Sequence, residues 1–552
     1  MARPFAQEPL FAPLLPLAVI LAAAAFTAAL TPSLIPRTGA LQGALAGTAF
    51  VVVYAIGVIL AALWRWLGLP LWRPAPLVWA AHAVALVIIA YGLARVTDWQ
   101  NAVHASAGMD PVETARPFII VAVALAVVLP LIALGRLVRL LVLAKANRMA
   151  RILPPRLALA AALATTAALF WMVGNGVLGG AVLRALDSGA RQVDALILAD
   201  QPPPAATERS GSAESLLDWD ELGAAGRRFV SSFPDADQIA ALAPPAPDGQ
   251  PVRDAARVYV GLNSAETPEE AAALALAELI RVDAFSRAIL VIATPTGTGF
   301  VHPASLSTLE YLWRGDVASV AVQYSYLPSW LTLLVDPDYG AETARAVFRN
   351  IHEHWRRLPA DSRPRLYLNG LSLGSLNSEL SVDLWDLLHA PHDGAFWVGP
   401  TFANPLWQDF TARRNPGTPA WRPQVGSGRL VRFATQQGIP DHGDTPWGPV
   451  RLLYLQYPSD AITFFSPQSL WRRPAWLRPR APDVSPAFRW VPVVSFLQLF
   501  ADLVAAFGTP VGVGHAYAAR DWLAGWHALT EPPGWTEDDL QQLRDWYVSI
   551  GR

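Results

Sequence analysis

A serine flanked by glycines lies between an apolar run and a helical pattern. The motif is Gly370-Leu-Ser372-Leu-Gly374, and Arg365-Leu-Tyr-Leu-Asn before it is typical of a buried strand. Where a strand turns this sharply into a helix, the backbones approach so closely that neither glycine position has room for a side chain. The hydroxyl then projects above the edge of a sheet. This context favours Ser372 as a nucleophile over an ordinary turn serine.

A serine hydroxyl attacks a carbonyl only when a base takes its proton and a carboxylate orients that base. In strand-to-helix serine sites the acid and then the histidine follow the serine along the chain. Asp460 comes after the apolar run Leu452-Leu-Tyr-Leu-Gln and a tight turn, so it is the predicted acid. The alternative makes Asp460 a helix N-cap, with Asp483 as the substitute acid.

The predicted base is His515, in the glycine-rich loop Pro510-Val-Gly-Val-Gly-His-Ala-Tyr. A base held on a turn suits this chemistry. His527 follows on a helical pattern beside Trp522 and Trp526, and is interpreted as a packing residue.

Negative charge on the attacked carbonyl oxygen needs fixed N–H donors. One is expected from the backbone of Leu373, just after the nucleophile. The other is expected from Thr296 and Gly297, in the glycine-rich loop after the run Ala288-Ile-Leu-Val-Ile-Ala. A phosphate-binding loop is the competing interpretation of this segment, but no Gly-Lys-Ser or Gly-Lys-Thr follows it.

No metal or other cofactor is expected. The chain has no cysteine, which excludes a Cys nucleophile, a thiolate metal site and a disulfide framework. His352 and His354 are two residues apart on a helical pattern and point to different faces, unlike a zinc pair. Asp441-His442-Gly-Asp444 is interpreted as a solvated turn. A formal net charge of −2, without a basic stripe, argues against nucleic acid as a partner.

Alternating strands and helices must position these residues. The expected strands are 257–262, 288–293, 317–324, 365–368, 395–398 and 450–456, and the expected helices are 268–281, 341–358, 373–388 and 493–507. This alternation predicts an α/β domain over residues 251–552, with a mainly parallel sheet flanked by helices. Two inserts rich in Pro and Trp, near 400–447 and 461–490, are interpreted as a cap over an apolar pocket, and aromatic packing under loops is an equally weighted alternative.

The first 185 residues predict a helical transmembrane domain. Hydrophobic residues make up 53% of the chain, and five apolar stretches are expected to span a membrane, near 14–34, 41–63, 77–94, 117–135 and 156–182. The basic loop between the last two is expected to be cytoplasmic, so five spans place the C-terminal domain outside. Residues 186–250, with their proline clusters, are interpreted as a polar linker.

Several motifs together resemble a known family, the bacterial membrane-bound α/β-hydrolases with a separate N-terminal membrane domain. They are Thr31-Pro-Ser-Leu-Ile-Pro-Arg37, Pro295-Thr-Gly-Thr-Gly299, Gln323-Tyr-Ser-Tyr-Leu-Pro-Ser329, Ser372-Leu-Gly-Ser375, Trp397-Val-Gly-Pro400, Tyr454-Leu-Gln456 with Ser459-Asp460, and Gly514-His515-Ala-Tyr517. The sequence departs from the family pattern at Leu371, where an acidic residue is usual, and at Ala461-Ile-Thr-Phe-Phe465, where a Pro-Val-Val-Trp-Trp-like run is usual. The resemblance implies a hydrolase with an α/β-hydrolase fold in a bacterial inner membrane.

The expected function is hydrolysis of a lipid or other hydrophobic ester through Ser372, His515 and Asp460, with the bilayer as a partner. An acyltransferase would use the same covalent intermediate, so the sequence does not separate the two. A membrane scaffold or transport component with an inactive hydrolase domain is the alternative from another class. The natural substrate and the oligomeric state are not readable from the sequence.

Overall fold

The computed structural model describes residues 14–70, 74–172, 202–232, 234–326 and 340–551. Its chain forms two compact units. The first, here the helical unit, comprises residues 1–186 together with 466–474 and 482–505. The second, here the sheet unit, comprises residues 187–465, 475–481 and 506–552. Part of the C-terminal region expected to belong to the α/β domain therefore packs with the N-terminal helices.

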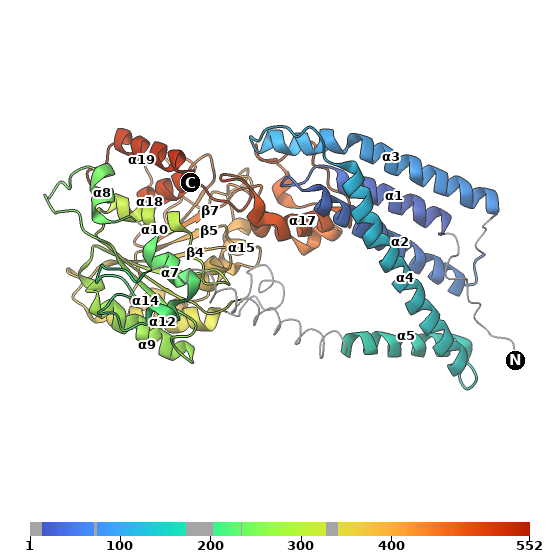
Figure 1. Ribbon diagram of the computed structural model, residues 1–552, viewed down its shortest axis with the longest axis horizontal. Helices are drawn as coiled ribbons and strands as arrows, with labels where there is room; N and C mark the ends of the chain where they lie inside the picture. Colours follow the sequence, from blue (N-terminus) through green and yellow to red (C-terminus); the bar gives the residue numbers. More distant parts are fainter. Residues whose placement is uncertain (1–13, 71–73, 173–201, 233, 327–339, 552) are drawn as a thin grey trace. The chain divides into compact units, whose positions relative to one another are not determined.

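Between residues 14 and 172, the described part of the N-terminal region, helices α1 to α5 follow one another (Figure 1). They are α1 (Pro16–Leu30), α2 (Gly39–Trp66), α3 (Ala75–Ser106), α4 (Pro117–Met149) and α5 (Pro155–Met172). Helices α2 to α5 are long and apolar enough to cross a membrane. The first expected span is a shorter helix, because α1 has only 15 residues and a span needs about 20. Residues 173–182 of the fifth expected span lie outside the described residues.

A helix from far along the chain completes this unit. Figure 1 shows α17 (Val494–Ala505) beside α1 and α2, against which it packs. Gln498 Nε2 donates hydrogen bonds to the carbonyl oxygens of Ala28 (3.2 Å) and Thr31 (3.1 Å). Carbonyl groups in the last turn of a helix lack the usual intrahelical partners, and Gln498 adds a donor there to the one that Thr31 already gives the carbonyl of Ala28. The expected helix over 493–507 therefore forms, and its partners are the N-terminal helices.

A buried ion pair fixes α17 to the segment between α1 and α2. Arg37 Nε lies 2.7 Å from Asp502 Oδ1, and their side chains are 1% and 0% exposed. The second oxygen of Asp502 accepts from the Leu34 N–H at 3.1 Å. The Arg37 guanidinium also donates to Gln42 Oε1 (3.2 Å) and to the hydroxyl of Ser33. The charges are thus buried but fully surrounded by hydrogen-bonding groups.

Seven parallel strands form the core of the sheet unit. They are β1 (Ala256–Val260), β2 (Ile289–Thr294), β3 (Val317–Val322), β4 (Arg365–Leu371), β5 (Gly394–Val398), β6 (Val431–Ala434) and β7 (Arg451–Leu455). Their order in the sheet is β1-β3-β2-β4-β5-β7-β6, and every pairing is parallel. Most of the residues in these strands are buried, as expected for strands covered on both faces. The predicted α/β fold with a mainly parallel sheet is confirmed.

Helices connect and cover these strands. They are α9 (Pro268–Arg281), α10 (Pro303–Leu312), α12 (Ala341–Arg357), α13 (Leu373–Glu379), α14 (Leu384–His389), α15 (Pro405–Ala412), α16 (Ala461–Phe464), α18 (Ala519–Thr530) and α19 (Glu537–Ser549). Short 3-10 turns lie at Trp219–Leu222, Ala284–Ser286, Pro467–Leu470, Ala475–Leu477 and Ala506–Gly508. All six expected strands form, and the seventh, β6, lies inside the insert predicted near 400–447.

The expected polar linker contains ordered structure in its described part. Helices α7 (Gly223–Ser231) and α8 (Ala236–Leu242) lie there, and α7 packs against β1. The Ser210 N–H donates to the carbonyl of Arg257 on β1 (3.0 Å), and the Arg257 N–H donates to the carbonyl of Glu208 (2.9 Å). This backbone ladder covers the free edge of β1, where an uncovered strand would invite aggregation.

Candidate active site

Ser372 occupies a strained turn between the centre of the sheet and a helix. It follows β4 directly, caps α13, and has φ 57° and ψ −124°. This backbone conformation is unusual for a residue with a side chain, and such strain persists only when the surroundings enforce it. Two hydrogen bonds do so here: the Ser372 N–H donates to the carbonyl of Val398 on β5, and the Ser375 N–H donates back to the carbonyl of Ser372.

The two glycines of the motif lie where no side chain fits. A Cβ at Gly370 would lie 2.4 Å from the carbonyl oxygen of Gly374. A Cβ at Gly374 would lie 2.3 Å from the carbonyl oxygen of Thr294 and 2.8 Å from that of Pro295. The turn is therefore crowded on both sides, by its own helix at one glycine and by the end of β2 at the other.

Replacing Gly374 with alanine is expected to lower the rate of reaction at Ser372 by about 100-fold, the cost of roughly an ångström of misplacement. The added methyl group would push the turn away from the backbone of Thr294, which cannot yield as a flexible side chain can. The rate of labelling by a fluorophosphonate measures this directly. Gly508→Ala is the matched control, because a Cβ there meets nothing within 4 Å. Equal labelling of both variants would contradict the steric argument.

Asp460 lies five residues beyond the end of β7 and binds His515. Its Oδ2 is 2.7 Å from His515 Nδ1, and both side chains are buried. A carboxylate only accepts hydrogen bonds, so Nδ1 is the protonated ring nitrogen and Nε2 keeps its lone pair. Asp460 also caps α16, because its Oδ1 accepts from the Ile462 N–H at 2.9 Å. Both interpretations of this residue, histidine partner and helix cap, therefore apply together.

The His515 ring packs on the turn that follows β5. A Cβ at Gly399 would lie 2.7 Å from His515 Cε1, so only a glycine lets the ring come this close. Gly399 is the residue after Val398, whose carbonyl holds the backbone of Ser372. His515 Nε2 is buried and makes no hydrogen bond within the described part of the chain. The serine, the ring and the carboxylate thus lie at the ends of the adjacent strands β4, β5 and β7.

The expected oxyanion donors have different surroundings. Leu373 is the first residue of α13, where a backbone N–H has no intrahelical acceptor. Thr296 lies in the loop after β2, next to the carbonyls that crowd Gly374, but its N–H donates to the carbonyl of Phe300 at 2.9 Å. In this conformation the Thr296 amide is occupied. Gly297 follows Thr296 in the same loop.

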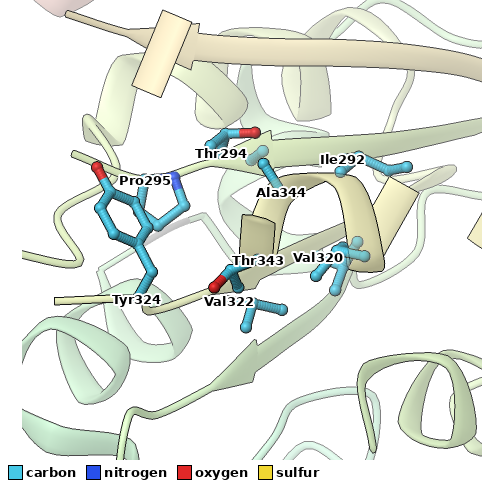
Figure 2. Close-up of a pocket in the computed structure, with 10 residues that line it drawn as sticks. Ile292, Thr294, Pro295, Val320, Val322, Tyr324, Thr343 and Ala344 are labelled. Carbon is cyan, nitrogen blue, oxygen red and sulfur yellow. The ribbon is translucent and has the colours of Figure 1, made fainter. Parts of the chain in front are cut away.

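A small pocket adjoins the same loop on the far side from β5. It is lined by Ile292, Ala293, Thr294, Pro295, Val320, Val322, Tyr324, Thr343, Ala344 and Val347. Figure 2 shows aliphatic side chains from β2 and β3 on one side of it, and Pro295 and Tyr324 on the other. Burial raises the pKa of Tyr324, so its phenol stays neutral. The pocket is mainly apolar and shares Thr294 and Pro295 with the wall behind Gly374.

The alternative candidates have other surroundings. His527 is part of α18, and burial lowers its pKa, as expected for a packed neutral imidazole. Asp483 belongs to the helical unit, whereas the carboxylate bound to His515 is that of Asp460. His352 Nε2 donates a hydrogen bond to the carbonyl oxygen of Ala390 (2.7 Å), and the ring stacks on Phe348. The described residues contain no group of three or more acidic, His or Cys side chains that could hold a metal ion.

The roles of two buried polar groups, one bound to Asp460 and one at the end of the helix that follows Ser372, were missed in the sequence. Tyr517 donates to Asp460 Oδ2 at 2.7 Å, and its position two residues after His515 was the available signal. Glu379, at the end of α13, accepts from Asn404 Nδ2 (2.8 Å) and the Tyr454 hydroxyl (3.1 Å). Burial raises the pKa of Glu379. Nothing in the pattern around Glu379 distinguishes it from a surface helix residue, so no sequence signal existed.

Comparisons with known proteins cover both units. Residues 256–543 match a family described as the alpha/beta-hydrolase family, and residues 30–234 match the N-terminus of that family. The first match alone covers more than half of the 552 residues. No curated protein and no solved structure matches the chain.

Proposed function

Because the chain belongs to the alpha/beta-hydrolase family, we propose that it is a membrane-associated serine hydrolase that cleaves a hydrophobic carboxylic ester. The observation that carries the proposal is the buried hydrogen bond between His515 and Asp460, at the sheet edge where Ser372 caps α13. An imidazole held in this tautomer offers a lone pair to a nearby hydroxyl, which is the role of a general base.

The proposed reaction proceeds in two halves through an acyl-enzyme. Ser372 Oγ bonds to the ester carbonyl carbon while its proton passes to His515 Nε2, and backbone N–H groups at Leu373 and Gly297 stabilise the negative oxygen. His515 then returns the proton to the departing alcohol as the ester C–O bond breaks. Water repeats the sequence: its proton goes to Nε2, its oxygen bonds to the acyl carbon, and Ser372 leaves with the proton. Asp460 stays ionised and holds the ring throughout.

Two observations support a hydrophobic substrate. Four helices are long and apolar enough to cross a membrane, so the protein is concentrated where apolar esters dissolve. The small cavity near the nucleophile turn is also lined mainly by aliphatic side chains, although its volume of about 10 Å³ fits only a water-sized group and an acyl chain would have to lie elsewhere.

A fluorophosphonate probe tests the proposal on the full-length protein in detergent. We expect one covalent adduct, located on Ser372 by peptide mass spectrometry, and no adduct in Ser372→Ala. Ser381→Ala is a matched control, since the hydroxyl of that buried serine donates to the carbonyl of Ser378, one turn earlier in the chain. Folded protein without an adduct would favour a non-catalytic scaffold. Product analysis with an ester, with and without an added alcohol, separates hydrolysis from acyl transfer.

A further inference from the structure

We propose that Tyr517 is a positioning residue of the candidate triad, which holds Asp460 in place and limits the negative charge that reaches His515. The inference rests on the proposed function. Its basis is that the Tyr517 hydroxyl and His515 Nδ1 bind the same carboxylate oxygen, Asp460 Oδ2, each at 2.7 Å.

The direction of the Tyr517 hydroxyl is fixed. Its oxygen accepts a hydrogen bond from the Tyr457 N–H at 3.3 Å, which leaves its own proton for the carboxylate. Burial and the charge of Asp460 raise the pKa of Tyr517 well above its ordinary value, so the phenol stays protonated. Tyr517 is therefore a permanent donor to the carboxylate.

The carboxylate cannot rotate while these contacts last. Oδ1 is held by the Ile462 N–H at 2.9 Å, and Oδ2 accepts from Tyr517 and, at 3.2 Å, from the Thr463 hydroxyl. Donors to a carboxylate stabilise its charged form. The same donors also reduce the negative charge that the carboxylate presents to the imidazole, and that charge would otherwise favour the protonated ring. Tyr517 thus holds the carboxylate in the orientation in which it binds His515 Nδ1.

Apart from Asp460, few charged groups lie close enough to the His515 ring to alter the pH profile of labelling. The Tyr457 hydroxyl bonds to Asp521, and Arg520 Nε lies 3.9 Å from that aspartate. The remaining elements around the ring contribute Phe507 and Gly399, which carry no charge. Thr463 supplies the only other side-chain donor to Asp460 among the described residues.

The test is the pH dependence of fluorophosphonate labelling at Ser372 in the full-length protein. In Tyr517→Phe the carboxylate charge would act more strongly on the imidazole, so the acidic limb of the profile is expected to shift upward by about one pH unit. The plateau rate is expected to fall about tenfold, because one bond that orients the base is lost. Tyr457→Phe is the matched control: it removes a buried tyrosine hydroxyl bonded to a different aspartate, Asp521.

A second variant distinguishes the loss of a hydrogen bond to Asp460 from misfolding of Tyr517→Phe. Thr463→Val keeps the side-chain volume and removes the longer contact to Oδ2, so it should shift the limb in the same direction by a smaller amount. If the profiles of Tyr517→Phe and Thr463→Val both coincide with that of Tyr457→Phe, the inference is overturned. Wild-type protein without an adduct on Ser372 would instead overturn the proposed function itself.

Discussion

Replacing His515 with alanine is expected to lower kcat for ester hydrolysis by about 10⁶-fold, as much as replacing Ser372, because groups that act as one unit are lost together. His515 Nε2 is buried and carries the lone pair that accepts the proton in the proposed mechanism. Without this nitrogen the hydroxyl of Ser372 keeps its proton. The measurement is kcat for a chromogenic short-chain ester with full-length protein in detergent. The double variant, with alanine at both Ser372 and His515, should be no slower than either single variant.

His527→Ala is the control for this prediction. His527 is the other histidine near the C-terminus; it lies within α18 and makes no hydrogen bond to Asp460 among the described residues. Its loss should leave kcat within about a factor of three, as for substitutions away from the reacting groups. If losses in the Ser372 and His515 variants were additive, the two side chains would not act in one step, and the proposed mechanism would be wrong.

Removing the carboxylate of Asp502 is expected to destabilise the helical unit by about 3–5 kcal/mol, the cost of leaving a buried charge without its partner. In Asp502→Ala the Arg37 guanidinium loses its only ion-pair partner among the described residues, and the Leu34 N–H loses its acceptor. The expected result is unfolding of the full-length protein at a lower denaturant concentration. Tryptophan fluorescence in detergent during a denaturant titration measures it.

Asp98→Ala provides the matched control within the same unit. The Arg95–Asp98 pair has a comparable contact of 2.8 Å, but its side chains are 51% and 59% exposed. Exposed ion pairs contribute about 0–1 kcal/mol, so this variant should unfold almost as the wild type does. Equal effects of the two substitutions would mean that burial of Asp502 adds nothing to the stability of the unit.

The sheet was readable from the sequence because its central strands are continuous apolar runs bounded by turn residues. This signal is strong at Ile289–Thr294 and Val317–Val322, where almost every residue is buried. The strand Val431–Ala434 escaped notice because it has four residues and contains Arg432 within a segment rich in Pro and Gly. Local pattern carries too little information for so short an edge strand.

The residues of the candidate site were predictable to different degrees. Ser372 was found because glycine spacing reports a steric demand that the structure contains at Gly370 and Gly374. The loop with Thr296 was found, but local sequence does not reveal that its amide binds Phe300. The packing of α17 was not predictable either, because Gln498 and Asp502 meet partners more than 460 residues away. Only tertiary structure brings such pairs together.

The contact between Asp502 and the segment after α1 can form only late in the synthesis of the chain. Leu34 and Asp502 are 468 positions apart, so at 5–20 residues per second a ribosome would make the second roughly 25 to 90 s after the first. During that interval the guanidinium of Arg37 has Ser33 and Gln42 as neighbours but no counter-ion from α17. The N-terminal helices therefore reach their final arrangement only after nearly the whole polypeptide has been translated.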